Sequence, residues 1–483
     1  MIEHLDVLVV GAGLSGIAAG YHLQTRCPGR TYAILESRDA IGGTWDLFRY
    51  PGIRSDSDMY TLGYSFRPWV SDRAIADGPS ILAYIRDTAR EHGIDRRIRF
   101  GHRVERAAWS TADARWLVEC TDTRTGATVR LTSSFLLMCT GYYDYAEGYS
   151  PDLPGRDTFG GRIVHPQQWT DDVDYAGKRI VVIGSGATAV TLVPALAETA
   201  AHVTMLQRSP TYIVSRPAVD KVATWLQRAL PDHAAHRTTQ WKNVLVSMAF
   251  YSFCRRFPDR ARELIRTGVR AQLPPDYDVD THFAPRYAPW DQRLCLVPDG
   301  DLFRAIRSGR AEVVTDHVEA LTPTGLTLRS GRRLDADLVV LATGLKLKLL
   351  GGMQLTVDGR QFEPSQTMNY KGAMFSDVPN LAVALGYTNA SWTLKCELIC
   401  EFVCRVLDHM ERGGHRICVP RRTDPSVTEE PIIDLRSGYV ERARAMLPPQ
   451  GSKPPWKLYQ NYVRDLVVMR HQAIEDGALR FEA

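Results

Sequence analysis

The sequence lacks an uninterrupted apolar run of about 18 residues, so no membrane-spanning helix is expected. It also lacks an excess of charge of one sign, because 59 Lys and Arg residues face 55 Asp and Glu residues and the formal net charge is only +4. A nearly neutral chain gives no reason to expect a nucleic-acid partner. Nine cysteines, an odd number, argue against a complete disulfide framework. The first residues, MIEHLDVLVVGAG, have none of the features of a signal peptide, so we expect a cytoplasmic protein.

What the chain does contain is the ordinary composition of a soluble globular protein, with 44% apolar and 24% charged residues. A chain of 483 residues can bury a large core, and at roughly 150 residues per domain it predicts two large or three smaller globular units. Disordered chains and small disulfide scaffolds are excluded as classes.

A dinucleotide-binding fingerprint opens the chain. Residues 5–10 form an apolar run that ends in GAGLSG, and a helical stretch and a second strand follow, ending at Glu36. Gly11 permits a tight turn, Gly13 lets the backbone approach a pyrophosphate, and Gly16 lets the helix pack closely on the strand. Glu36 follows about 20 residues after the last glycine, where an acid accepts hydrogen bonds from a ribose diol. This fingerprint predicts a site for a nucleotide with an unphosphorylated ribose, and we assign it to FAD.

A second fingerprint of the same kind begins near residue 179. Residues 179–183 form a strand that leads into GSGATA, a helix follows, and the next strand ends in Gln-Arg-Ser at residues 207–209. The acid is replaced by Arg208, and a guanidinium pairs with a 2′-phosphate that a carboxylate would repel. We therefore expect NADPH at this second site. The residues predicted to bind it are Gly184, Gly186, Ala187, Thr188, Arg208 and Ser209.

Two dinucleotide sites in one chain predict an α/β protein with two Rossmann-like domains, one for FAD and one for NADPH. Two apolar strands end in Thr-Gly, at residues 140–141 and 343–344, and such strand ends are typical of the passages between the two domains. The FAD-binding domain is then discontinuous. The expected ranges are 1–145 and 336–483 for the FAD-binding domain with the C-terminal segment, 150–335 for the NADPH-binding domain, and about 215–290 for a helical insertion.

Between the two fingerprints, residues 159–169 read FGGRIVHPQQW and fit the pattern FxGxxxHxxxW. The chain thereby resembles the type I Baeyer–Villiger monooxygenases, which are class B flavoprotein monooxygenases. Trp169 favours this branch over the flavin-containing monooxygenases with Tyr or Phe at that position. The segments GGTWDLFRYPGIRSDSDMYTLGYSF, WDQRLCLVPDGDLFRAIR and GYTNASWTLK resemble the subgroup of mycobacterial ethionamide-activating monooxygenases. Phe159, Gly161 and His165 fill the other fixed positions, and we expect His165 to position the NADPH domain rather than to transfer a proton.

The resemblance implies a chemistry. In this family NADPH reduces FAD, and the reduced flavin reacts with O₂ to a C4a-peroxyflavin, which inserts one oxygen atom into a ketone and yields an ester or lactone. Oxygenation of sulfur in sulfides or thioamides is implied as well. Two related alternatives stay open, a flavin monooxygenase that oxygenates only heteroatoms and a hydroxylase of long alkyl chains. A FAD- and NADPH-binding electron-transfer flavoprotein that oxygenates nothing is the alternative from another class.

The resemblance also assigns the catalytic residues. Arg293, in WDQRL, matches the active-site arginine of the family, and Asp56 matches the acid that pairs with it. A fixed positive charge would stabilise the anions that form during oxygen insertion. The helix that follows Asn389 is expected to face the flavin, with the hydroxyls of Ser391 and Thr393 suited to its N-terminal caps. The further residues assigned to the FAD site are Gly43, Thr44, Trp45, Asp56, Asn389 and Thr393.

Two other patterns receive weaker interpretations. Cys396, Cys400 and Cys404 recur at helical spacing without a histidine, so we expect core packing and no metal site. Residues 241–257, WKNVLVSMAFYSFCRRF, are rich in apolar side chains and end in a basic cluster. They could line a substrate tunnel, pack in the core, or contact a membrane surface, so peripheral membrane association stays an alternative. No oligomeric state is predicted.

Overall fold

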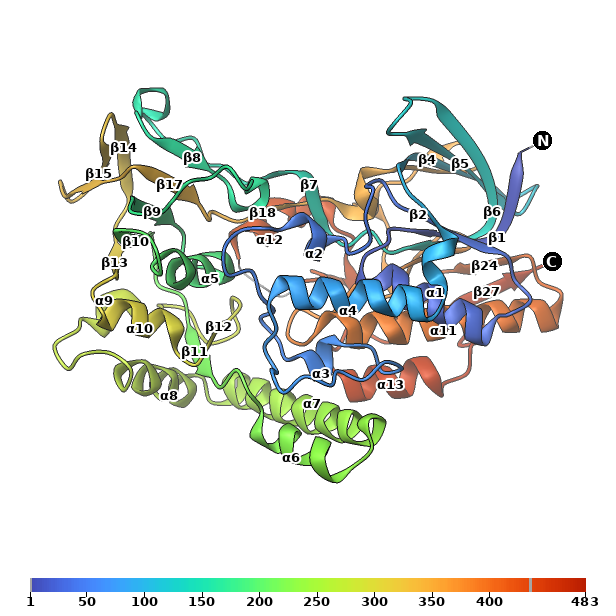
Figure 1. Ribbon diagram of the computed structural model, residues 1–483. Coiled ribbons are helices and arrows are strands. Elements are labelled where there is room, and N and C mark those ends of the chain that lie inside the picture. The colour runs from blue at the N-terminus through green and yellow to red at the C-terminus, as the bar shows by residue number, and fades with distance from the viewer. Residues whose placement is uncertain (1, 434–436) are drawn as a thin grey trace.

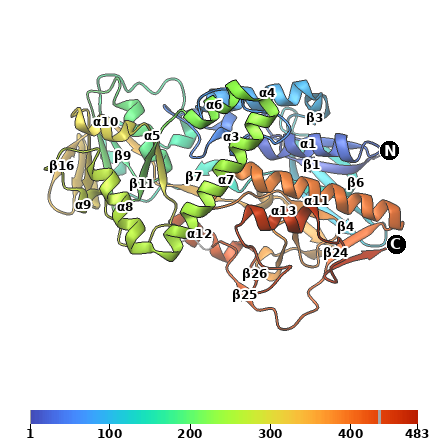
Figure 2. The same ribbon diagram turned by 90° about the horizontal axis from the view of Figure 1, so that it is seen from below.

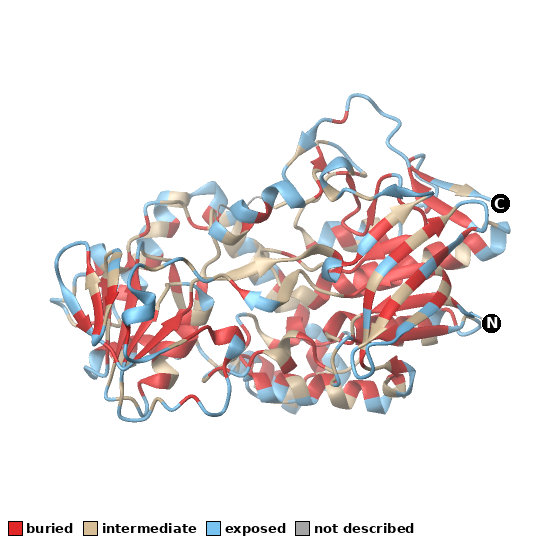
Figure 3. Ribbon diagram, turned by 90° about the horizontal axis from the view of Figure 1, so that it is seen from above, coloured by how far each residue is buried: buried red, intermediate tan, exposed pale blue. Residues whose placement is uncertain are grey.

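In the computed structural model, which describes residues 2–433 and 437–483, the chain forms two lobes, each built around one β-sheet (Figure 1). The larger sheet has nine strands and the smaller one has five. Buried residues concentrate in the strands of both lobes (Figure 3). The predicted fold class, α/β with two Rossmann-like units, is confirmed.

The larger sheet begins with the first fingerprint. β1 (Glu3–Val10) pairs in parallel with β2 (Tyr32–Leu35), and α1 (Leu14–Arg26) connects them. β1 is buried because β6 (Thr128–Met138) covers its other edge, which explains its nearly continuous apolar sequence. The remaining strands are β3 (Ile98–Arg99), β4 (His102–Ser110), β5 (Arg115–Asp122), β19 (Gln354–Val357), β20 (Arg360–Gln361) and β23 (Leu381–Val383). Since the last three follow the smaller lobe in the sequence, two separate stretches of chain build this sheet.

The smaller sheet contains the second fingerprint. Its strands are parallel, in the order β13 (Ala311–Thr315), β10 (His202–Gln207), β9 (Arg179–Ile183), β17 (Leu338–Leu341) and β8 (Arg162–Val164). α5 (Ala187–Leu196) starts at the second glycine turn, directly after β9. The antiparallel strands β14 (Val318–Thr322), β15 (Gly325–Leu328) and β16 (Arg333–Asp335) precede β17. The carboxyl ends of β9 and β10 therefore share one edge, where sheets of this type bind ligands.

Two passages of the chain connect the lobes and lie side by side. β7 (Tyr143–Gly148) follows β6, and β18 (Leu345–Leu347) follows β17. The two strands pair antiparallel, with Leu347 beside Tyr143. Both begin just after a Thr-Gly strand end, so the prediction that these ends mark the passages between the units is confirmed.

Helices fill the predicted insertion. They are α6 (Lys221–Ala229), α7 (Asp232–Arg256), α8 (Pro258–Arg270) and α9 (Val279–Phe283). β11 (Ile213–Arg216) leads into them, and β12 (Cys295–Pro298) leads out and pairs with β11 in parallel. α7 packs against α3 (Met59–Leu62) of the larger lobe, so the insertion spans both lobes (Figure 2).

α11 (Trp392–Gly413) is mostly buried in the larger lobe, where it packs against α1 and α13 (Tyr462–Arg470). Cys396, Cys400 and Cys404 lie on α11 and pack in the hydrophobic core, as predicted. All nine cysteines are buried free thiols, which agrees with the expectation of no disulfide framework.

Buried ion pairs tie the C-terminal segment to this lobe. Lys395 Nζ lies 2.8 Å from Asp465 Oδ2, and Lys371 Nζ lies 2.7 Å from Asp476 Oδ2. Tyr387 also donates its hydroxyl to Asp465, at 2.7 Å. The remaining helices and strands are α2 (Thr44–Leu47), α4 (Gly78–Glu91), α10 (Asp301–Arg307), α12 (Gly438–Ala443), β21 (Asn369–Tyr370), β22 (Met374–Phe375), β24 (Ile417–Pro420), β25 (Glu429–Glu430), β26 (Gln450–Gly451) and β27 (Leu479–Glu482).

Candidate functional site

The first glycine turn has a geometry that larger residues would disrupt. Gly11 has a φ of +105°, and its N–H donates to the Leu35 carbonyl at 2.7 Å. A Cβ on Gly16 would lie 1.9 Å from the carbonyl oxygen of Gly11, so α1 packs against the turn only with glycine there. Gly13 is the N-cap residue of α1 and faces Gly43 across the turn. The free N–H groups at this helix start suit an anion.

A cavity of about 590 Å³ lies at the carboxyl ends of β1 and β2. Most of the residues assigned to FAD form its wall, and Gly16, which does not line the cavity, packs against the lining residue Gly11. The predicted residues that line this cavity are Gly11, Gly13, Glu36, Gly43, Thr44, Trp45, Asp56 and Arg293. The glycine-lined turn and the helix start leave room for a pyrophosphate against the backbone, so the residues present fit the predicted FAD.

Glu36 is held rigidly at the end of β2. Its Oε2 accepts the N–H of Ala12 at 2.8 Å, and its Oε1 accepts the N–H of Arg38 at 2.9 Å. The residue is only 6% exposed, yet it lines the cavity. An acid fixed at this strand end is what ribose recognition requires.

The second glycine turn lies at the edge of the smaller sheet. Gly184 has a φ of +142°, and a Cβ there would lie 2.2 Å from the Ala342 carbonyl oxygen. Ala187 and Thr188 reach the wall of the first cavity, whereas the other predicted NADPH residues do not. Those residues, which lie around the turn and at the end of β10, are Gly184, Gly186, Arg208 and Ser209. Arg208 and Ser209 are exposed, so both are accessible to a ligand.

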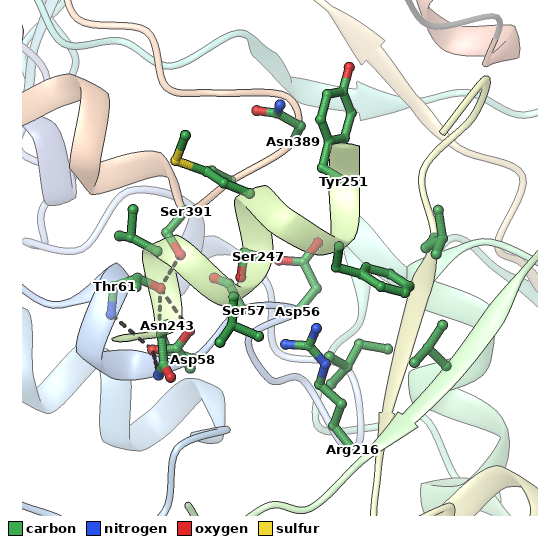
Figure 4. A pocket seen from close by; sticks show the side chains of 18 of the residues that line it. Asp56, Ser57, Asp58, Thr61, Arg216, Asn243, Ser247, Tyr251, Asn389 and Ser391 are labelled. Carbon is green, nitrogen blue, oxygen red and sulfur yellow. Dashed lines mark hydrogen bonds between the residues drawn. The ribbon is translucent and has the colours of Figure 1, made fainter. Parts of the chain in front are cut away.

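A second cavity of about 570 Å³ lies beside the first, with α7 as one wall (Figure 4). Much of its lining is apolar, including Val214, Val244, Met248, Phe250, Leu294 and Leu296. Six residues line both cavities, namely Asp56, Ser57, Arg293, Leu296, Ala390 and Ser391. The two cavities therefore adjoin at these six residues.

Arg293 and Asp56 are brought together at the shared wall. Arg293 Nη1 lies 3.4 Å from Asp56 Oδ2, although 237 residues separate them in the sequence. Burial alone would lower the pKa of Arg293, but the neighbouring Tyr142 and Asp56 outweigh it, so the pKa lies above its usual value. The Nε of Arg293 is buried without a hydrogen-bond partner among the described residues. The guanidinium is thus a permanent cation on the wall shared by the two cavities.

Residues 241–257 form the wall of the second cavity. The residues of this segment that line it are Asn243, Val244, Val246, Ser247, Met248, Phe250, Tyr251 and Ser252. Val244 and Cys254 also pack in the interior. The structure thus supports both the tunnel and the core alternatives for different side chains. In the described part of the chain, no helix is long and apolar enough to cross a membrane.

His165 lies between the two passages that connect the lobes. Its Nε2 lies 3.2 Å from the Gly344 carbonyl oxygen, and its Nδ1 accepts the N–H of Gln167 at 3.2 Å. A Cβ on Gly148 would lie 1.9 Å from the His165 ring, so β7 passes directly over the imidazole. Burial lowers the pKa of His165, with the Gly344 hydrogen bond opposing this. His165 lines neither cavity. Its predicted role in positioning the NADPH domain stays a proposal, and its contacts with Gly344 and Gly148, one on each passage, are consistent with that role.

The other fingerprint residues pack in the smaller lobe. Phe159 and Trp169 are buried, and Trp169 contacts Tyr175 with ring centroids 5.9 Å apart. A Cβ on Gly161 would lie 2.5 Å from the Asp337 carbonyl oxygen, so glycine allows β8 to approach β17. These residues build the lobe rather than a cavity.

The start of α11 differs from the prediction. Ser391 occupies the N-cap position, but its side chain makes no capping hydrogen bond. Its hydroxyl instead lies 2.6 Å from the hydroxyl of Thr61, and Thr393 donates to the Leu62 carbonyl oxygen. The prediction that the hydroxyls of Ser391 and Thr393 cap the helix is therefore wrong, because both hydroxyls bond to residues of α3 instead. Thr393 lines neither cavity, and Asn389 lines the second cavity rather than the first.

Sequence reasoning missed several residues of the second cavity. Asp58 follows Asp56 in a segment that was assigned only to the flavin site, and Asn243 contacts it at 2.9 Å. Arg216 stands at the end of β11, in a region without a recognised motif. The only signal for Asn243 and Arg216 was a single polar position in largely apolar surroundings, and Asp58 lies in the polar run RSDSD, where it does not stand out.

Comparisons with known proteins identify the family of the chain. Residues 9–72 match the family described as NAD(P)-binding Rossmann-like domain, and residues 71–225 match the family described as Flavin-binding monooxygenase-like. The chain is 56% identical over 482 residues to the FAD-containing monooxygenase EthA of Mycobacterium tuberculosis, covering 100% of this chain and 98% of the relative. It is 45% identical over 484 residues to the probable FAD-binding monooxygenase AlmA of Acinetobacter baylyi, covering 100% of this chain and 97% of the relative.

Solved structures share the fold. An oxidized steroid monooxygenase bound to NADP matches with a TM-score of 0.77 and 24% identity, covering 99% of both chains. A closed crystal structure of cyclohexanone monooxygenase matches with a TM-score of 0.68 and 22% identity, covering 87% of both chains. With its relatives and its two nucleotide-binding units, the chain belongs to the FAD-containing monooxygenases of the class B flavoprotein type, enzymes that use FAD, NADPH and O₂ to oxygenate a small molecule.

Proposed function

We propose that this monooxygenase inserts one oxygen atom from O₂ into ketones to give esters or lactones, and that it also oxygenates sulfur in sulfides or thioamides. The observation that carries the proposal is the place of Arg293, on the wall shared by the two cavities and 3.4 Å from Asp56. The first cavity takes FAD and the second takes the substrate. The cation then stands where the two reactants meet.

The bound reduced flavin supplies the activated oxygen. The residues of the chain supply charge and position. Attack of an oxygen nucleophile on a ketone places negative charge on the carbonyl oxygen, and the Arg293 guanidinium is a preorganised donor for that charge. Asp56 orients the guanidinium and partly balances its charge before the anion forms. Asn389 reaches the same cavity and is a polar contact for the substrate.

At the second turn, Arg208 and Ser209 bind the 2′-phosphate of NADPH, and Gly184, Gly186, Ala187 and Thr188 approach its pyrophosphate. His165 holds the two passages in register, so the NADPH-binding lobe keeps its place relative to the FAD. The predicted division gives residues 1–145 and 336–483 to FAD and 150–335 to NADPH, but β17 (Leu338–Leu341) pairs within the smaller sheet, so we move the second boundary to after residue 341.

The test is a turnover experiment with product identification. Purified enzyme with FAD is incubated with NADPH, O₂ and a linear ketone, and an ester is expected by mass spectrometry. Arg293→Ala should lower ester formation at least about a hundredfold, as loss of a preorganised donor does, while the flavin absorbance stays. Arg286→Ala removes an exposed arginine seven residues earlier and should behave like the wild type. An unchanged ester yield in Arg293→Ala would remove Arg293 from this role.

The alternatives give other products. Sulfoxide from a sulfide, with no ester from any ketone, would favour oxygenation of heteroatoms only. An alcohol from a long alkane would favour a hydroxylase. Oxidation of NADPH that yields only hydrogen peroxide would favour a flavoprotein that does not oxygenate.

A further inference from the structure

Arg216 presents an unpaired positive charge to the second cavity. It is the last residue of β11, it is partly buried, and it lines the cavity. Figure 4 shows its side chain rising from the strand toward Asp56 and Ser57. Within residues 2–433 and 437–483, its guanidinium makes no hydrogen bond and no ion pair at 4.0 Å or less.

Two acids on the cavity wall already have ion-pair partners. Asp56 pairs with Arg293, at 3.4 Å, and Asp220 pairs with Lys242. Lys221 is exposed at the surface end of the wall and adds a further positive charge. The pairing of the two acids leaves Asp58 as the remaining carboxyl group near Arg216.

Asp58 does not neutralise Arg216 by direct contact. It accepts hydrogen bonds from the Thr61 N–H at 3.0 Å, the Thr61 hydroxyl at 2.9 Å and the Asn243 amide at 2.9 Å. Removal from water raises the pKa of Asp58, with these hydrogen bonds and the charge of Arg216 opposing this. The carboxyl group is thus committed to its own network, and Arg216 keeps its donors.

The cavity opens to the surface on one side and has an apolar lining from α7 and β12 further in, with Val244, Met248 and Leu296 among its residues. Val219, Lys221 and Val222 line it and are also exposed, so its mouth lies beside the start of α6, close to Arg216 in the chain. Arg216 pairs with Pro298 at the end of β12, whereas Arg293 precedes Cys295 at its start, so the backbones of the two arginines lie at opposite ends of this strand pair.

We propose that the natural substrate is an amphipathic ketone with a carboxylate at one end, that Arg216 binds this carboxylate near the mouth, and that the apolar interior carries the chain to the carbonyl beside Arg293. A single guanidinium offers two parallel N–H donors, which match the two oxygens of a carboxylate. Only the identity of the reacting group rests on the ketone oxygenation proposed above.

The first experiment compares an acid with its own ester. The substrates are a long saturated fatty acid with a ketone on the penultimate carbon and the methyl ester of the same compound. The wild type should show the higher kcat/KM for the acid. Arg216→Gln should lower kcat/KM for the acid on the order of ten- to a hundredfold, the range for a hydrogen bond to a charged group, and leave the ester unchanged.

Two variants and one substrate act as controls. Arg216→Lys should restore part of the preference for the acid. Arg228→Gln removes an exposed charge from α6 outside the cavity wall and should change neither substrate. Unchanged turnover of the ester shows that Arg216→Gln folds and keeps its flavin. Equal kcat/KM of the wild type for acid and ester, or an equal loss of both in Arg216→Gln, would overturn the proposal.

A binding measurement separates this proposal from the proposed function. Calorimetry with the oxidised enzyme, loaded with FAD and NADP⁺, gives the affinity for acid and ester without turnover. If no ketone is oxygenated but the acid still binds more tightly than the ester and only with Arg216 present, the proposed function fails and carboxylate recognition stands. If ketones are oxygenated and Arg216→Gln binds the acid as the wild type does, carboxylate recognition fails alone.

Discussion

His236 makes the attachment of the insertion sensitive to acid. It lies on α7, is 3% exposed, and accepts the N–H of Trp69 on its Nδ1 at 3.1 Å. Its Nε2 is buried without a hydrogen-bond partner in the described residues. Protonation would turn Nδ1 into a donor facing another donor and would place a charge in the interior, so the folded protein resists it.

The size of the effect follows from the pKa. Burial, together with the nearby His233, lowers the pKa of His236 from 6.5 to about 4. Because the pKa of His236 is lower in the folded than in the unfolded protein, neutral His236 contributes its full share to the free energy of unfolding above pH 6.5. This contribution is lost as the pH falls from 6.5 through 4. At about 1.4 kcal/mol per pKa unit, the loss is about 3 kcal/mol. With roughly 2 cal/mol/K per residue for the unfolding entropy, a chain of this length that unfolds as a unit loses about 3 °C in Tm.

The assay is thermal unfolding of wild type and His236→Gln at several pH values between 4 and 7.5. Glutamine keeps an acceptor for Trp69 but does not titrate in this range, so we expect its Tm to fall less with acid than that of the wild type. His233→Gln, exposed one turn earlier on α7, is the control and should follow the wild type closely. An identical acid-induced fall of Tm in His236→Gln and the wild type would refute the reasoning.

Three further outcomes are expected. Arg208→Ala should raise the KM for NADPH at least about tenfold and leave the KM for NADH nearly unchanged, because only NADPH carries the 2′-phosphate; equal effects would place that phosphate elsewhere. Gly16→Ala brings a Cβ to 1.9 Å from a carbonyl oxygen of the first turn and should lower the FAD content of the purified protein, whereas Gly29→Ala, with open space around it, should not. Asp465→Asn leaves the buried charge of Lys395 without its carboxylate and should destabilise the protein by about 3–5 kcal/mol in urea unfolding. Burial lowers the pKa of Lys395, so this destabilisation should shrink as the pH rises toward 10, and a constant value would contradict the assignment.

The fold was largely predictable because each of its two nucleotide-binding units begins with a short sequence pattern that can be recognised without knowledge of the rest of the chain. Each fingerprint places strand, turn and helix within about 30 residues, and backbone sterics enforce the glycines at Gly11 and Gly184. The pairing of Arg293 with Asp56 was reached only through family resemblance, since no local pattern joins residues that far apart. The start of α11 shows where prediction from local sequence fails. Ser391 is a residue type that commonly caps helices, but its hydroxyl bonds to Thr61, which is distant in the sequence. Arg216 lies on a wall assembled from distant segments, which no short pattern encodes.

The part of the cavity wall formed by α7 is separate from the glycine turns of the two nucleotide-binding units. Asn243, Ser247 and Tyr251 recur every four residues and form one stripe on the cavity. Under the proposed function, exchanges at Ser247 and Tyr251 should alter which compounds fit, while the glycine turns and the Arg293–Asp56 pair stay untouched. Variant libraries confined to these two positions are then a direct route to altered selectivity.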